Sequence, residues 1–187
     1  MIDEAAAVAA VRDFLRAVGL DPEDPRLAET PERIAAAARE IFSGVGRDAV
    51  AALGAAGVMD AVAPGPVAVR GIPFSSMCEH HLLPFRGTVA IGYLPSERLV
   101  GIGDFDAMVR ILSARPQIQE RLGDEIAETV EIALAARGVI VLIDAEHSCM
   151  WARGERTVGA SVRTIAARGV YREGEAGRDE GLTLVSR

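Results

Sequence analysis

Apolar residues recur at helical spacing near the start of the chain, and this pattern predicts an amphipathic helix over residues 3–19 that ends at Gly19. The apolar positions of this helix are Val8, Val11, Phe14, Leu15 and Val18. The sequence Thr30-Pro31-Glu32-Arg33 is typical of a second helix start, with Thr30 as the N-cap and Pro31 at the first helical position. That helix should extend to about residue 44, and a short helix over residues 49–53 should follow it.

The pattern changes after Pro66, where apolar runs of strand length alternate with helical periodicity. The expected strands are 67–74, 88–94, 139–143 and 156–165, and the expected helices are 105–113 and 116–137, the second ending at Gly138. The tail after residue 170 is polar and should be exposed. Helices followed by β-β-α-α-β-β predict an α+β fold with antiparallel strands and helices on one face. We expect an N-terminal helical region over residues 1–65 and a second domain over 66–187.

Charge and composition exclude several classes of protein. The chain has 187 residues and a net charge of −7, which argues against a general nucleic-acid binder. Its two cysteines are too few for a disulfide framework and favour a reducing compartment. We find no signal peptide and no apolar run of membrane-spanning length, so we expect a cytoplasmic protein without a membrane partner.

Every cysteine and histidine of the chain lies in one of two short segments, Cys78-Glu79-His80-His81 and His147-Ser148-Cys149. Thiolates and imidazoles are the ligands that zinc prefers, and a catalytic zinc site uses three protein ligands and keeps one open position. Cys78, His81 and Cys149 can supply the three, with His80 and His147 beside the metal. Two alternatives stay open: buried cysteines with ordinary surface histidines, and a structural zinc site with His147 as a fourth ligand.

A zinc ion with three ligands activates a bound water for attack on an electrophilic carbon, and a free imidazole nearby can move protons. Glu120, at the start of the long predicted helix, could accept two N–H groups from a guanine edge, or it could simply complement the helix dipole. Arg153 and Arg33 could each bind a phosphate, or they could be solvated surface groups.

Several segments, in order and with the expected spacing, resemble the GTP cyclohydrolase I family from about residue 10 to 172. They are Gly19-Leu20-Asp21-Pro22, Thr30-Pro31-Glu32-Arg33, residues 72–85 around Cys78-Glu79-His80-His81, Arg115-Pro116-Gln117-Ile118-Gln119-Glu120-Arg121-Leu122, and residues 147–154 around His147-Ser148-Cys149-Met150. The Cys-Glu-His-His and His-x-Cys-Met segments are highly specific in combination. They speak against other enzymes of the same fold, such as a pterin aldolase or a nitrile reductase.

The resemblance implies the tunnelling fold, with the catalytic domain in residues 66–187. In that fold subunits join their sheets into rings, commonly as a homodecamer with active sites between subunits. It also implies Zn²⁺ on Cys78, His81 and Cys149, with acid–base roles for His80 and His147.

For the substrate, the resemblance implies a guanine anchored by Glu120 and a triphosphate bound by Arg153 and by Arg33 of a neighbouring subunit. Gln119, Ile118 and Ile102 are implied as further substrate-binding residues. In the family, water activated by zinc attacks C8 of GTP, formate leaves, and 7,8-dihydroneopterin triphosphate forms as the entry to tetrahydrofolate and pterins.

One segment departs from the family pattern. Where the family typically has a serine, a lysine and, three residues later, an arginine, this chain has Gly103, Asp104 and Ala107. The loss of two cations and the gain of an acid predict weaker triphosphate binding. The alternatives are therefore a homologue that acts on a different or less phosphorylated purine, one that stops at a ring-opened product, and a non-catalytic zinc-containing paralogue.

Overall fold

The computed structural model describes residues 2–54, 58–60, 65–154, 156–172 and 174–186. The chain divides into two compact units, Met1–Ser43 and Gly44–Arg187. This division falls before the predicted boundary at residue 65, because the short helix α3 (Ala49–Leu53) packs against helices of the second unit.

The first unit is a pair of packed helices, α1 (Glu4–Ala17) and α2 (Thr30–Ile41). The α1 N-cap is Asp3, whose carboxylate accepts a hydrogen bond from the Ala6 N–H at 3.0 Å. The predicted N-cap of α2 was wrong by one residue: Glu29 precedes the helix, and Thr30 is already helical. Pro31 still lies in the first turn, where its missing N–H costs nothing.

The second unit is built on a five-stranded sheet with the order β5-β2-β3-β6-β7. Its long strands are antiparallel, and only the two-residue β5 runs parallel to β2. The elements of this unit after α3 are β1 (Val58–Asp60), β2 (Val67–Cys78), β3 (Pro84–Leu94), β4 (Arg98–Val100), α4 (Ile102–Ser113), β5 (Pro116–Gln117), α5 (Gln119–Leu134), β6 (Gly138–His147), α6 (Ser148–Trp151), β7 (Ser161–Gly169) and α7 (Glu175–Val185). The predicted α+β class and the β-β-α-α-β-β order of the main elements are confirmed.

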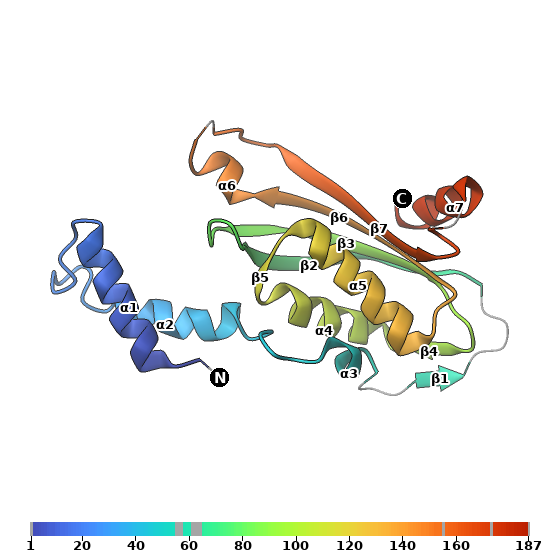
Figure 1. The fold of residues 1–187 in the computed structure, drawn as a ribbon, viewed down its shortest axis with the longest axis horizontal. Coiled ribbons are helices and arrows are strands. Elements are labelled where there is room, and N and C mark those ends of the chain that lie inside the picture. The colour runs from blue at the N-terminus through green and yellow to red at the C-terminus, as the bar shows by residue number, and fades with distance from the viewer. Residues whose placement is uncertain (1, 55–57, 61–64, 155, 173, 187) are drawn as a thin grey trace. The chain divides into compact units, whose positions relative to one another are not determined.

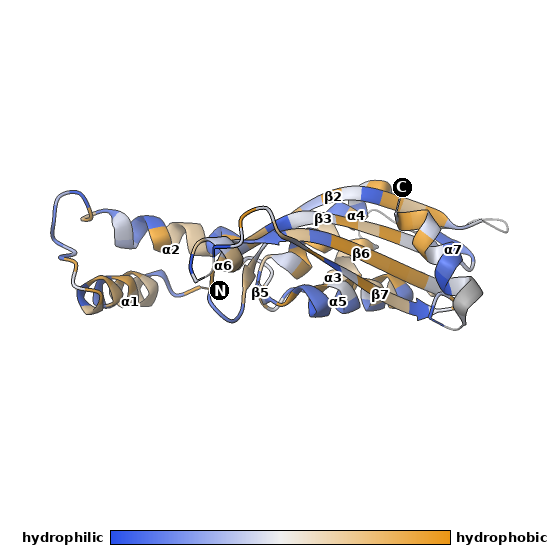
Figure 2. Cartoon of the chain, turned by 90° about the horizontal axis from the view of Figure 1, so that it is seen from above, coloured by the Kyte–Doolittle hydropathy of each residue, from blue (hydrophilic) through white to orange (hydrophobic). Residues whose placement is uncertain are grey.

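Helices α4 and α5 pack on the sheet in one layer and α7 in another (Figure 1), and alternation along the strands gives each layer its own apolar cluster. On one face, residues such as Val89, Val141 and Ile143 enter the main core beneath α4 and α5. On the other face, Ile140 and Leu142 form a second cluster beneath α7. The central strand β6 is therefore apolar on both sides for most of its length, which explains the continuous orange of this strand in Figure 2.

Several predicted bounds were wrong. The final strand, expected over 156–165, is β7 at Ser161–Gly169, the helix expected over 105–113 begins at Ile102, and the helix expected to reach about residue 44 ends at Ile41. The helix expected over 116–137 begins only at Gln119, because Pro116 and Gln117 pair with the end of β2. That helix ends at Leu134, its C-cap Ala135 adopts the left-handed conformation at φ 47°, and Gly138 instead begins β6. The tail after residue 170 is not simply exposed, because it forms α7, which buries Val185. Among the described residues, no helix combines the length and the apolar character that crossing a bilayer requires.

Candidate active site

A tight turn follows β2 and directs His81 back toward Cys78. The Cys78 N–H donates to the Leu83 carbonyl at 2.9 Å, and the Leu82 N–H donates to the Cys78 carbonyl at 2.8 Å. Leu82 has a φ of 50°, a left-handed conformation that a side chain rarely adopts. The turn is thus closed by backbone bonds at both ends, and it places the thiol and the imidazole on the same side.

A second anchor brings Cys149 to this turn. His147 ends β6 and lies opposite Phe85 in the antiparallel register of β3 and β6. The next residue, Ser148, is buried, and its hydroxyl donates to the Pro84 carbonyl at 2.6 Å. This bond ties the start of α6 to the start of β3, so the Cys149 thiol faces the turn after β2.

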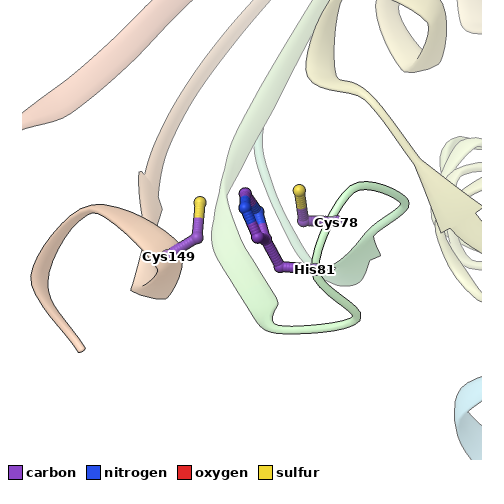
Figure 3. A group of neighbouring side chains, drawn as sticks. All are labelled: Cys78, His81 and Cys149. Carbon is purple, nitrogen blue, oxygen red and sulfur yellow. The ribbon is translucent and has the colours of Figure 1, made fainter. Parts of the chain in front are cut away.

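The three predicted ligands lie together: the Cys78 sulfur, one His81 ring nitrogen and the Cys149 sulfur are all within 4.8 Å of one another. In Figure 3 the imidazole lies between the two sulfurs. Zinc ligands at about 2.0–2.3 Å from the metal stand about 3.5–3.8 Å apart in a tetrahedral site. A contraction of about 1 Å would therefore seat the ion, and the donor set fits zinc. Among the described residues this cluster does not include His147, which disfavours a four-ligand structural site.

The thiols share this site with a cation. Burial raises the pKa of the Cys149 thiol, and the charge of Cys78 and its hydrogen bond with Cys149 raise it further. The positive charge of Arg153 acts in the opposite direction. The Arg153 guanidinium lies 3.1 Å from Nε2 of His81, where it can only donate. A metal on either ring nitrogen removes the lone pair that Arg153 uses, because the other nitrogen must then carry the proton. Metal binding and the Arg153–His81 hydrogen bond therefore exclude each other.

His147 lies against a flat aromatic surface. Its ring stacks on Phe85 with a centroid distance of 4.6 Å and an interplanar angle of 5°. Burial lowers the pKa of His147, and the negative charge of Glu120 acts in the opposite direction. His80, by contrast, is exposed and meets the His81 ring edge-on at a centroid distance of 6.3 Å. The two non-ligand histidines thus have different environments.

The start of α5 brings the predicted guanine-binding residues to His147. Ile118 occupies the N-cap position, Gln119 is buried, and Glu120 is exposed in the first turn. The oxygen of the Gln119 amide lies 2.7 Å from Nε2 of His147. The negative charge of Glu120, on the next residue of the helix, opposes the lowering of the His147 pKa by burial.

A network of ion pairs and hydrogen bonds joins the start of α5 to the turn after β2 that carries His81. Arg121 pairs with Glu79, which lies directly after Cys78, and its Nε donates to the Gln117 side-chain oxygen at 2.9 Å. The Gln117 amide nitrogen in turn donates to Glu125 at 2.6 Å. The helix that carries Glu120 and the turn that carries His81 are therefore joined by side chains as well as by the β2–β5 pairing.

The segment that departs from the family pattern, with Gly103, Asp104 and Ala107, forms the first turns of α4. Ile102 is 74% exposed, and Gly103 and Ala107 are also exposed. Asp104 is half-buried, and among the described residues its Oδ2 atom has no hydrogen-bond partner. Its place in the first turn is electrostatically favourable for an acid.

Arg33 belongs to the first unit, where its guanidinium pairs with Glu29 at 2.5 Å.

A groove on the opposite face of the sheet does not include the predicted ligands. It has a volume of about 570 Å³ and is lined by Pro73, Phe74, Arg86, Gly87, Thr88, Asp144, Ala145, Glu146, Gly159 and Ser161. In β3, Arg86 points to the groove while its neighbour Phe85 packs against His147. At this end of the sheet, one face therefore carries the candidate metal ligands and the other carries the groove.

The sequence did not point to Phe85 or Ser148 as site residues, nor to the buried position of Gln119. Phe85 and Ser148 fall inside the recognised segments, but their contacts depend on the register between β3 and β6. The one sequence signal for Gln119 is its place directly before the candidate acid Glu120, and that signal does not indicate burial.

Comparisons with known proteins agree with these features. A profile described as GTP cyclohydrolase I matches residues 7–186. A protein of Leifsonia xyli named GTP cyclohydrolase 1 is 47% identical over 98% of this chain and 95% of its own length. Proteins of the same name from Mycobacteroides abscessus and Dehalococcoides mccartyi are each 43% identical, over 100% and 99% of this chain and 92% and 98% of their own lengths. A solved apo structure of an archaeosine synthase QueF-Like covers 58% of this chain and 97% of its own, with a TM-score of 0.46 at 19% identity.

Proposed function

The chain belongs to the GTP cyclohydrolase I family, and on this premise we propose that it opens the imidazole ring of GTP at C8 in a zinc-dependent hydrolysis. Formate is released, and 7,8-dihydroneopterin triphosphate is the final product. The observation that carries this proposal is the convergence of Cys78, His81 and Cys149 beside a half-buried, stacked His147. The shared name of the relatives supports GTP over another purine and supports catalysis over a non-catalytic role.

Cys78, His81 and Cys149 would hold the zinc, which supplies a polarised water as nucleophile at neutral pH. His147 is held flat against Phe85 beside this site, and its imidazole moves a proton to or from the purine as the ring opens. The exposed His80 exchanges protons with solvent at the mouth of the site.

Glu120 recognises guanine in this proposal. Its carboxylate is exposed, and it can accept the N1–H and one 2-amino hydrogen of the base as two parallel hydrogen bonds. Ile118 and Ile102 are the further residues at the purine. Glu120 directly follows Gln119, whose amide oxygen lies 2.7 Å from Nε2 of His147, and this supports base recognition next to the proton-transfer group.

Arg153 and Arg33 bind the triphosphate. The Arg153 guanidinium lies 3.1 Å from Nε2 of His81, and a metal on His81 would leave it free to bind a phosphate. Arg33 pairs with Glu29 within its own unit, and in this proposal it comes from a neighbouring subunit. A homodecamer built from joined sheets would bring these groups together. The protein would then work in the cytoplasm, at the entry to tetrahydrofolate biosynthesis.

The test is an incubation of the zinc-loaded protein with GTP in which formate and pterin fluorescence are both measured. We expect both products, and we expect His147→Ala to lose activity while it retains zinc. Formate without pterin would mean that the reaction stops after ring opening. No formate from GTP, GDP, GMP or guanosine with zinc bound would refute the proposed function.

A further inference from the structure

The Gln119 side chain is almost completely buried, and all of its polar atoms are occupied. It is 2% exposed, although it lies beside a candidate active site. Its amide nitrogen donates to the carbonyls of Ile143 at 3.1 Å and Val162 at 2.8 Å, and lies 3.1 Å from the Thr164 hydroxyl oxygen. The side chain thus connects the start of α5 to the neighbouring strands β6 and β7.

These contacts determine which way the amide faces. Backbone carbonyls only accept hydrogen bonds, so the group beside Ile143 and Val162 must be the NH₂ group of the amide. The amide oxygen therefore faces His147, where its distance to Nε2 is 2.7 Å. An amide oxygen cannot donate, so the proton of this hydrogen bond must belong to His147.

We propose that Gln119 is a positioning residue that acts through His147: it holds the imidazole as the Nε2–H tautomer and leaves the lone pair on Nδ1. This rests on the proposed function for the role of His147 in proton transfer. It differs from the guanine contact that the family resemblance implies for Gln119: the amide nitrogen already donates to Ile143 and Val162 and has no hydrogen left for a base.

Two contacts then fix the imidazole completely. Stacking on Phe85 sets the plane of the ring, and the bond to Gln119 sets its rotation within that plane. A half-turn about the Cβ–Cγ bond would exchange Nε2 with a carbon and lose the bond to Gln119. His147 consequently presents one defined nitrogen, Nδ1, for the proton that moves during the reaction.

The tautomer can be measured without turnover. The chain contains only three histidines, so ¹⁵N-histidine labelling gives few ring signals, which His147→Ala assigns. At a pH where His147 is neutral, we expect Nε2 to carry the proton in the unaltered protein and Gln119→Met to give a mixture of tautomers. The control is Gln117→Met, which removes a second buried glutamine whose hydrogen bonds in the described part of the chain involve Leu112, Glu125 and Arg121 rather than His147. A proton on Nδ1 in the unaltered protein would overturn the proposal.

Kinetics separate positioning from base recognition. With GTP we expect Gln119→Met to lower kcat about tenfold or more and to leave KM within about twofold, because the proton-transfer group is misplaced. The preference for GTP over inosine triphosphate, which lacks the 2-amino group, should not change, whereas Glu120→Gln should change it. In a His147→Ala background the same substitution should cost little further activity. A raised KM with a changed base preference would instead make Gln119 a guanine-binding residue.

The two readouts keep this inference distinct from the proposed function. If the unaltered protein released no formate from GTP, the proposed function would fail, and the ring signals of His147 would still decide the tautomer. If formate were released but the tautomer were Nδ1–H, the proposed function would stand and the role of Gln119 would be wrong.

Discussion

Replacing Cys149 by alanine tests whether the second segment completes the metal site. Cys149 is the only member of the triad that comes from α6, and without it Cys78 and His81 remain as two ligands on one turn. The Cys149 side chain is small and half-buried, so we expect its loss to cost only about 1 kcal/mol in the metal-free protein. Any larger effect must therefore come from the metal.

Linkage gives the size of the metal effect. A ligand at 100 times its Kd stabilises the folded state by about 2.7 kcal/mol. For a chain of this size each kcal/mol changes Tm by about 2–4 °C, so zinc should raise the Tm of the unaltered protein by about 5–11 °C. Cys149→Ala should lose this rise, because the two remaining ligands bind zinc far more weakly than three.

The assay is thermal unfolding with a chelator and with added zinc, together with the zinc content of the dialysed protein. His80→Ala is the matched control, since it removes the exposed imidazole next to His81 and should keep the full zinc effect. Cys149→Ala protein that retained one zinc per chain and the full rise in Tm would refute the ligand assignment. Loss of the zinc effect in His147→Ala would instead indicate a structural site with four ligands.

Three further predictions follow from the geometry. A Cβ at Gly87 would lie 2.0 Å from the Asp144 carbonyl oxygen, so Gly87→Ala should destabilise the protein by about 1–3 kcal/mol in urea unfolding. The control is Gly103→Ala: a Cβ at Gly103 has nothing within 4 Å, so this variant should raise the free energy of unfolding by about 0.5–1 kcal/mol. Similar unfolding free energies for the two variants would contradict the packing argument. Asp104→Lys should lower the KM for GTP about tenfold or more without changing that for guanosine, and an unchanged KM for GTP would place the triphosphate elsewhere. Because burial raises the pKa of Cys149 and zinc binds the thiolate, zinc affinity measured against a chelator should rise with pH until that raised pKa is passed, and a flat profile would argue against a thiolate ligand.

The order of the main elements could be predicted because each depends on a local pattern. The strand β6 contains the unbroken apolar run 139–143, and α4 and α5 show helical periodicity. The errors occurred where a non-local contact outweighed that pattern. Pro116 and Gln117 look like a helix start, yet they pair with β2, and the polar tail carries buried residues only because α7 packs against the sheet.

The candidate metal ligands could also be predicted, because zinc chemistry depends on residue type and the chain has only two cysteines and three histidines. Their segments further indicated the family, which the comparisons confirm. The roles of the individual site residues stay predictions. Nothing local in the sequence could show that Cys149 faces the turn after β2, since that depends on the Ser148–Pro84 bond between distant segments.

By itself, then, the sequence determined the inventory of the site: two thiols, three imidazoles and an acid at a helix start. Only the tertiary structure decided how these groups meet. The register of β3 and β6 stacks His147 on Phe85, and the carbonyls of β6 and β7 turn the Gln119 amide toward His147. The physical reason is that residue type fixes which hydrogen bonds and metal bonds a group can form, whereas burial and strand register determine which partner takes them.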